Sequence, residues 1–230
     1  MAGVSRLQYS TFTRLIRVMC SGRVDLLNVL KAFSKGADGV FIGGCHFNEC
    51  YYVTGGNFST LGMVLIAKRI LQEIGLDPRR VRLDNMSAGE GIRFAQLVGD
   101  FNKEIAELGP LGVSEGLDEA KLKSDLELFS NLVPYIKLVE RERLRMPVQS
   151  EEAYLEFFAG SEFNRLFDET IKEKFVISQI ASILRKSPLN TGEIANAINL
   201  SPSEASKYLA SSSKQRFIKF DEKLKQYALA

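Results

Sequence analysis

The chain has 230 residues, of which 45% are hydrophobic, 25% charged and 10% aromatic, with a formal net charge of +2. This composition excludes the disordered and collagen-like classes, and the length suits one large domain or two small ones. Thirty basic residues against twenty-eight acidic ones leave no dense basic stripe, so nucleic acid is not the expected partner. No apolar run is long enough to span a bilayer and no secretory signal is evident, so we expect a cytoplasmic protein without a membrane span.

The first part of the chain alternates short apolar runs with amphipathic segments, which indicates an α/β domain with parallel strands. We expect strands and helices in turn over residues 15–20, 24–35, 39–45, 58–74 and 81–86. A third helix is expected to begin with a capping box from Ser87 to Glu90 and to end at Gly109. The predicted fold is a small parallel sheet covered by helices, Rossmann-like or flavodoxin-like.

The rest of the chain divides into an acidic part and a compact helical part. The acidic stretch, residues 113–173, is predicted to be helical, with breaks at Pro134 and Pro147. After a helix from about residue 174, capping boxes at Asn190 and Ser201 open two short helices, and residues 216–229 suggest a hairpin. This order resembles a winged helix. The predicted domains are an α/β domain, an acidic helical connector and a winged-helix-like domain, over residues 1–112, 113–173 and 174–230.

All three cysteines of the chain lie between residues 20 and 50. Cys20 and Cys45 each end a predicted strand, and the carboxyl ends of parallel strands meet at one edge of the sheet. Cys50 follows Cys45 at a Cys-x4-Cys spacing, with the only histidine, His46, in between. The glycines before Cys45, the free backbone amides of this edge and Arg23 form surroundings that favour thiolate over thiol.

The residues alone leave three interpretations of these cysteines open. Buried cysteines are commonly small core side chains. Zinc is the second interpretation, with Cys20, Cys45, Cys50 and His46 as a tetrahedral set, although adjacent Cys and His residues seldom both reach one ion. The third is an iron–sulfur cluster, since plant-type ferredoxins use a Cys-x4-Cys spacing for two of their ligands. For His46 we expect a supporting or surface role ahead of direct ligation.

Four motifs, in this order, resemble the delta subunit of methyl-viologen-reducing hydrogenase, and the resemblance covers about residues 3–112. They are residues 19–24 (MCSGRV), 35–40 (KGADGV), 44–51 (GCHFNECY) and 87–91 (SAGEG). The resemblance implies a 2Fe-2S cluster that passes electrons between a hydrogenase, or another dehydrogenase, and the flavin-containing A subunit of heterodisulfide reductase. It implies no substrate chemistry in this protein itself. By position, Cys20, Cys45 and Cys50 become cluster ligands, and Arg23 and His46 become groups that tune the potential.

The chain departs from this family at its beginning. Relatives have an earlier strand that ends in a two-cysteine segment, whereas this sequence has no tryptophan and no fourth cysteine for four-thiolate ligation. We therefore expect the authentic start to lie upstream of Met1, with the missing segment carrying cysteine or, as in some relatives, selenocysteine.

The predicted winged helix raises an alternative function, that of an iron–sulfur or zinc sensor that regulates transcription by binding DNA. A recognition helix needs cations, and residues 202–211 offer only Lys207. We therefore expect this domain to dock on partner subunits or to serve the structure.

Overall fold

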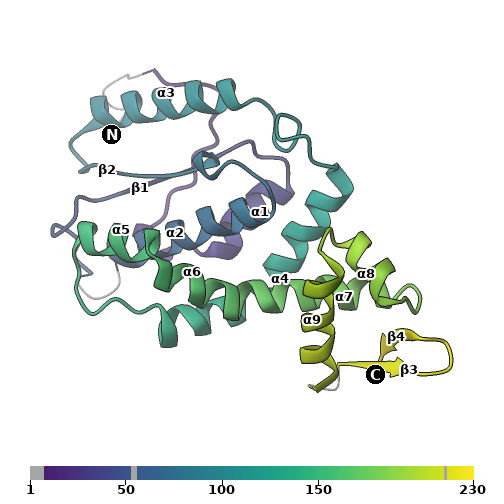
Figure 1. Ribbon diagram of the computed structural model, residues 1–230. Helices are drawn as coiled ribbons and strands as arrows, with labels where there is room; N and C mark the ends of the chain where they lie inside the picture. The colour runs from purple at the N-terminus through teal and green to yellow at the C-terminus, as the bar shows by residue number, and fades with distance from the viewer. Residues whose placement is uncertain (1–7, 53–55, 215–216) are drawn as a thin grey trace. The chain divides into compact units, whose positions relative to one another are not determined.

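The computed structural model of the protein describes residues 8–52, 56–214 and 217–230. Its architecture is mixed α/β and mostly helical, with one small parallel sheet (Figure 1). The chain divides into two units: the first comprises Met1–Val133 and Arg145–Phe163, and the second comprises Pro134–Leu144 and Asn164–Ala230. Over the described ranges, no helix has the length and apolar character needed to cross a membrane.

The secondary structure of the first unit begins with a short 3-10 turn and ends in α-helices. Its elements are η1 (Ser21–Arg23), α1 (Leu26–Ser34), β1 (Val40–Gly44), α2 (Asn57–Glu73), η2 (Pro78–Arg80), β2 (Val81–Asn85), α3 (Gly91–Leu108), the first part of α4 (Glu119–Arg143), α5 (Glu151–Ala159) and the start of α6 (Ser161–Phe167). The second unit continues α4 and α6 and adds the π-helical turn η3 (Asp168–Lys172), α7 (Glu173–Leu184), α8 (Thr191–Ala197), α9 (Pro202–Lys214), β3 (Ile218–Asp221) and β4 (Gln226–Leu229).

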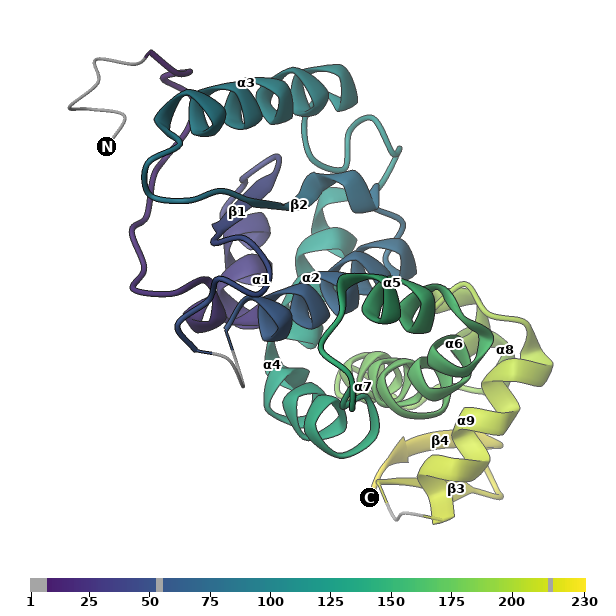
Figure 2. The ribbon, with the colours of Figure 1, turned by 90° about the vertical axis from the view of Figure 1, so that its left-hand side faces the viewer.

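The sheet of the first unit consists of β1 and β2, which pair in parallel from Val40↔Val81 to Gly44↔Asn85. Helix α3 covers one face of the sheet, and α1 and α2 cover the other (Figure 2). The central apolar side chains, such as Leu30 of α1 and Ile70 of α2, are fully buried. This layering confirms the predicted order of helices and strands from residue 24 to residue 86.

The strand predicted over residues 15–20 is wrong, because this segment forms no strand in the structure. Leu15, Ile16 and Met19 expose 64%, 83% and 94% of their surface. An apolar run becomes a strand only when its backbone pairs with a neighbour and its side chains find a surface to pack on, and the described residues offer this run neither. The sheet therefore has two strands where three were expected.

Two other local predictions differ from the structure. The break expected at Pro134 does not occur: α4 continues through it, because buried side chains such as Phe129 and Ile136 hold the helix in place. The break near Pro147 does occur, between α4 and α5. The capping box expected at Ser87 is half formed: the Glu90 carboxylate accepts the Ser87 N–H, but α3 begins only at Gly91 and has no side-chain cap.

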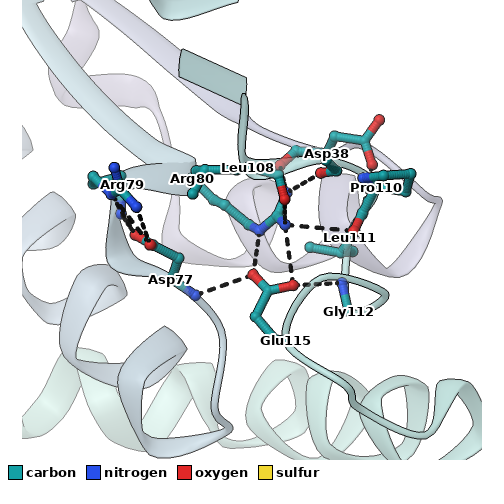
Figure 3. Close-up of polar contacts among 10 residues, drawn as sticks. Asp38, Asp77, Arg79, Arg80, Leu108, Pro110, Leu111, Gly112 and Glu115 are labelled. Atoms are coloured by element: carbon teal, nitrogen blue, oxygen red, sulfur yellow. Dashed lines mark hydrogen bonds and ion pairs between the residues drawn. The ribbon is translucent and has the colours of Figure 1, made fainter. Parts of the chain in front are cut away.

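The start of the sheet is closed by a buried arginine (Figure 3). Arg80 has no exposed side-chain surface and forms two hydrogen bonds with the Glu115 carboxylate, with N–O distances of 2.6 and 3.0 Å. The guanidinium also donates to the backbone carbonyls of four residues: Asp38, Leu108, Gly109 and Pro110. Arg80 thereby joins the turn before β1, the end of α3 and the loop that leads to α4.

The second unit packs three helices and a hairpin around one apolar core. The predicted capping boxes at Asn190 and Ser201 are both confirmed by reciprocal hydrogen bonds. Strands β3 and β4 pair antiparallel, and Leu189 forms an isolated bridge with Tyr227 of β4. Arg216, at the start of the predicted hairpin, lies outside the described residues. The core of the unit consists of Val176, Ile180, Leu184, Ile194, Ile198, Leu209 and Ile218.

Candidate functional site

The site begins where β1 ends. Gly44 is the last residue of β1, so Cys45 projects from the carboxyl end of the sheet, and η1 places Cys20 beside it. A side chain at Gly44 would come within 3.1 Å of the Ser21 Oγ atom. Glycine at this position therefore allows η1 to approach the end of β1, which is why two cysteines far apart in sequence meet.

A tight turn brings Cys50 back toward Cys45. The Glu49 N–H donates to the His46 carbonyl at 3.2 Å, and Asn48 adopts a left-handed backbone with a φ of 68°. Asparagine tolerates this conformation better than most residues. The ring of Phe47 stacks on Phe58 of α2, with 4.8 Å between ring centroids, and this contact anchors the turn to the helix.

The three thiols interact with one another. Burial, a hydrogen bond with Cys50 and the charge of Cys50 raise the pKa of Cys45 to about 11, and the charge of Cys20 adds to this effect. Burial also acts to raise the pKa of Cys50, but hydrogen bonds from the backbone of Asn57 and Tyr52 and from the other two thiols outweigh it and lower that pKa. Of Cys45 and Cys50, Cys50 is therefore the one that ionises to a thiolate more readily.

The amino terminus of α2 faces the cysteines. A Cβ atom at Gly56 would overlap the Cys50 sulfur and come within 2.8 Å of the Tyr52 carbonyl oxygen. The buried Asn57 side chain reaches the opposite side of the turn, where it donates to the carbonyls of Cys45 and His46. Sequence reasoning missed Gly56 and Asn57, although their place at the start of a predicted helix just after Cys50 was the available signal.

His46 is held by Glu90, the residue before α3, rather than by the thiols. Its Nε2 atom lies 2.7 Å from Oε2 of Glu90, and both side chains are about one-third exposed. The backbone N–H of Ser87 and the His46 ring lower the pKa of Glu90 to about 2, so this carboxylate is ionised at neutral pH. The Arg23 side chain is exposed, and its backbone N–H donates to the Cys20 carbonyl. His46 and Arg23 thus border the cysteines without closing a Cys3His set.

Two buried polar atoms next to the thiols have no hydrogen-bond partner: Ser21 Oγ and Asn85 Oδ1. Both lie against Gly44, at the edge where Cys20 and Cys45 meet. Buried polar atoms nearly always have a hydrogen-bond partner, so two unpaired ones at this edge are a feature expected of a binding site. Within the described part of the chain, no three His, Cys, Asp or Glu side chains converge on a single metal ion. Three cysteine sulfurs beside unpaired polar atoms are a donor set of the kind that iron–sulfur groups and zinc both use.

Comparisons with known proteins concern the first unit. A family model described as methyl-viologen-reducing hydrogenase, delta subunit, matches residues 1–109. The chain is 41% identical over 110 residues to the iron-sulfur D subunit of the F420-non-reducing hydrogenase of Archaeoglobus profundus, a match that spans 48% of this chain and 80% of the relative. The corresponding vhc iron-sulfur D subunit of Methanococcus voltae is 44% identical over 114 residues, which are 50% of this chain and 78% of that one.

A longer relative contains the same region. The A subunit of the ferredoxin/F(420)H(2)-dependent CoB-CoM heterodisulfide reductase of Methanosarcina acetivorans is 46% identical over 112 residues. The match covers 49% of this chain but only 14% of that relative. The shorter relatives are covered over most of their length at well above 30% identity, and all the cysteines of the site lie within the matched region. The chain therefore belongs to the methyl-viologen-reducing hydrogenase delta subunit family.

Proposed function

We propose that the chain is a non-catalytic electron-transfer subunit that carries a 2Fe-2S cluster on Cys20, Cys45 and Cys50. The observation that carries the proposal is the meeting of these thiols at the carboxyl end of the sheet, in a domain whose relatives are named iron-sulfur subunits. An iron–sulfur group would supply a site for single electrons there. The chain's own residues would bind it through sulfur and shield it from solvent.

The Cys50 sulfur lies in surroundings that stabilise negative charge, whereas burial and the neighbouring thiols disfavour negative charge on Cys45. Cys50 accepts backbone hydrogen bonds at the start of α2, where the helix dipole is positive. Arg23 and His46 stand at the border of the site, where charge and hydrogen bonding would tune the potential. Three thiolates are one fewer than a four-cysteine cluster needs, so the fourth position would belong to a ligand that is not a cysteine of this sequence.

The partners follow from the relatives. In the heterodisulfide reductase relative this region is part of a longer chain, whereas in the hydrogenase relatives it makes up most of a separate polypeptide. The proposed partners are therefore a heterodisulfide-reductase-like flavoprotein on one side and a hydrogenase or other dehydrogenase on the other, in the cytoplasm. No substrate other than the electron would be handled by this chain.

The parts that follow the family match would fasten this domain to the complex. We retain residues 1–112, 113–173 and 174–230 as the iron–sulfur domain, the acidic connector and a winged-helix-like domain. The order α7, α8, α9 and hairpin, with the bridge between Leu189 and Tyr227, supports the last assignment. Helix α9 exposes Lys207 and Lys214 among serines, a face too poor in cations to favour DNA binding.

The test is anaerobic purification of the chain, followed by iron and zinc analysis and EPR spectroscopy of the reduced sample. We expect iron, little zinc and an EPR signal that disappears when the reduced chain is mixed with the oxidised flavoprotein. Cys20→Ser, Cys45→Ser and Cys50→Ser should each lose the signal, while Gly99→Ala, on an open face of α3, should keep it. An oxygen-protected chain that carries stoichiometric zinc and no iron would refute the proposal.

A further inference from the structure

We propose that Asn57 is a positioning residue of the cysteine site, one that fixes Cys45 and Cys50 relative to each other and donates N–H groups toward both sulfurs. On the proposed function, Asn57 also raises the reduction potential of the bound iron–sulfur group. Its first part, the positioning of the thiols, concerns the chain alone and can be tested without iron.

The side chain of Asn57 is committed to the turn that carries the cysteines. Its Nδ2 atom lies 2.8 Å from the His46 carbonyl oxygen, 3.1 Å from the Cys45 carbonyl oxygen and 3.8 Å from the Cys45 Sγ atom. Only 2% of the residue is exposed. An amide nitrogen has two hydrogens for these three acceptors, so the Cys45 sulfur shares a hydrogen with one of the two carbonyl oxygens. The amide therefore holds the backbone on both sides of the bond between Cys45 and His46.

The backbone of Asn57 serves the second cysteine. Its N–H donates toward the Cys50 sulfur, and this hydrogen bond is among the causes that lower the pKa of Cys50. The sulfur can come this close because Gly56 has no side chain. One residue at the start of a long helix therefore contacts both cysteines of the Cys-x4-Cys pair, from its side chain and from its main chain.

The role of Asn57 differs from ordinary helix capping. A capping side chain accepts a hydrogen bond from the backbone N–H groups of the first turn. The cap position of α2 is Gly56, which has no side-chain cap, and the Asn57 amide donates backward to the turn. A carboxylate at position 57 would suit the helix start at least as well, because negative charge is stabilised there. It would have no N–H to give the two carbonyls.

The expected effect on electron transfer follows from charge. Reduction adds a negative charge to an iron–sulfur group, and N–H donors near its sulfurs stabilise the reduced form more than the oxidised form. Helix α2 is extensively buried and holds these donors in a fixed position. Loss of the Asn57 amide should therefore lower the potential, and a negative charge in its place should lower it further.

The discriminating variant is Asn57→Asp, which keeps the shape and favours the helix but removes the donor. Its matched control is Asn28→Asp, an exposed position in the first turn of α1 that undergoes the same chemical change. Asn57→Ser, whose hydroxyl retains one donor, is a second variant in case the aspartate prevents folding. All are made in the full chain, and circular dichroism verifies that each retains its helices.

Two measurements follow. In the iron-free chain, mass spectrometry follows the alkylation of each cysteine by iodoacetamide. We expect Cys45 to react severalfold faster in Asn57→Ser than in the wild type or Asn28→Asp, because the freed turn exposes the thiol, and by a smaller factor in Asn57→Asp, whose carboxylate disfavours the thiolate. In the iron-loaded chain, a dye-mediated titration followed by EPR should give potentials in the order wild type, Asn57→Ser, Asn57→Asp, with Asn28→Asp equal to the wild type.

The two claims fail in different ways. Unchanged Cys45 alkylation in both Asn57 variants would overturn the positioning role, whether or not iron binds. Altered alkylation with an unchanged potential would overturn the tuning role alone. A wild-type chain that binds no iron would refute the proposed function, while the alkylation rates would still decide the role of Asn57.

Discussion

The contact between Arg80 and Glu115 allows a sharp prediction about stability. Glu115→Gln keeps the shape of the side chain but removes the charge that compensates a guanidinium with no exposed surface. The two hydrogen bonds to Glu115 are bidentate, and the carboxylate also accepts the backbone N–H groups of Asp77 and Gly112. A glutamine amide in its place would point its own N–H groups at N–H donors of Arg80 or of the backbone. The variant therefore leaves a buried charge without its counter-ion.

The magnitude follows from this burial. Removing one partner of a buried pair typically costs about 3–5 kcal/mol, and because glutamine keeps one acceptor oxygen we expect about 3 kcal/mol. For a chain of this size, that corresponds to a fall in melting temperature of roughly 6–12 °C. Arg80→Met combined with Glu115→Leu should not recover the loss: no charge is then left buried, but the four carbonyls and two N–H groups that these side chains satisfy lose their partners.

The pH dependence of the loss provides a second test. Burial acts to raise the pKa of Glu115, but Arg80 and the backbone N–H donors outweigh it and lower that pKa below its ordinary value. The stabilisation is therefore complete above the ordinary glutamate pKa and fades as the pH falls through the lowered pKa of the folded protein. The difference between wild type and Glu115→Gln should shrink in that acidic range.

Urea unfolding of both proteins, at neutral pH and over an acidic series, measures these effects. Arg80 precedes β2, whereas Cys45 follows β1, so the network and the cysteine site lie at opposite ends of a parallel sheet. Glu115→Gln should therefore weaken the fold while leaving the cysteine site intact. A loss below about 1 kcal/mol, or one that does not depend on pH, would refute the reasoning, because an exposed ion pair would behave that way.

Two further substitutions test how the site is supported. Gly56→Ala should displace the Cys50 sulfur from the start of α2 and abolish iron binding. The control Gly99→Ala has open space around its Cβ position, so it should leave iron binding unchanged and stabilise the helix slightly. Iron analysis of both variants tests this. The ring of Tyr154 in α5 lies 5.7 Å from the ring of Phe58, between centroids. Tyr154→Ala should therefore lower the free energy of unfolding by about 1 kcal/mol and shorten the lifetime of the bound cluster in air. Tyr154→Phe, which keeps the ring, should change neither. Equal lifetimes in both tyrosine variants would show that α5 does not support the site.

The sequence predicted those parts of the fold that depend on local signals. The helices after Val24 follow from apolar spacing, and Gly36 adopts the positive φ that a residue after a helix end requires. The strand over residues 15–20 failed because a strand depends on a neighbour elsewhere in the chain, which the run of apolar residues does not reveal. Helix α4 passes Pro134 because tertiary packing overrides a local breaker.

The site was predictable to a similar degree. Cysteines at the ends of two strands were expected to meet from the general geometry of parallel sheets, even though one of those strands does not form. The donors around them could not be predicted, because the Asn57 amide acts through a contact with a turn eleven residues earlier. Glu90 was interpreted as a capping residue, and its hydrogen bond to His46 depends on where α3 begins.

The central claim is that Cys20, Cys45 and Cys50 together hold one iron–sulfur group. Native mass spectrometry of the anaerobically prepared chain tests it most directly, because it weighs the bound group on the intact protein. We expect an added mass of two irons and two sulfides, absent from each of the three cysteine-to-serine variants. A chain that carries no added iron and sulfide, or one that keeps the full added mass when two of these cysteines are replaced, would contradict it.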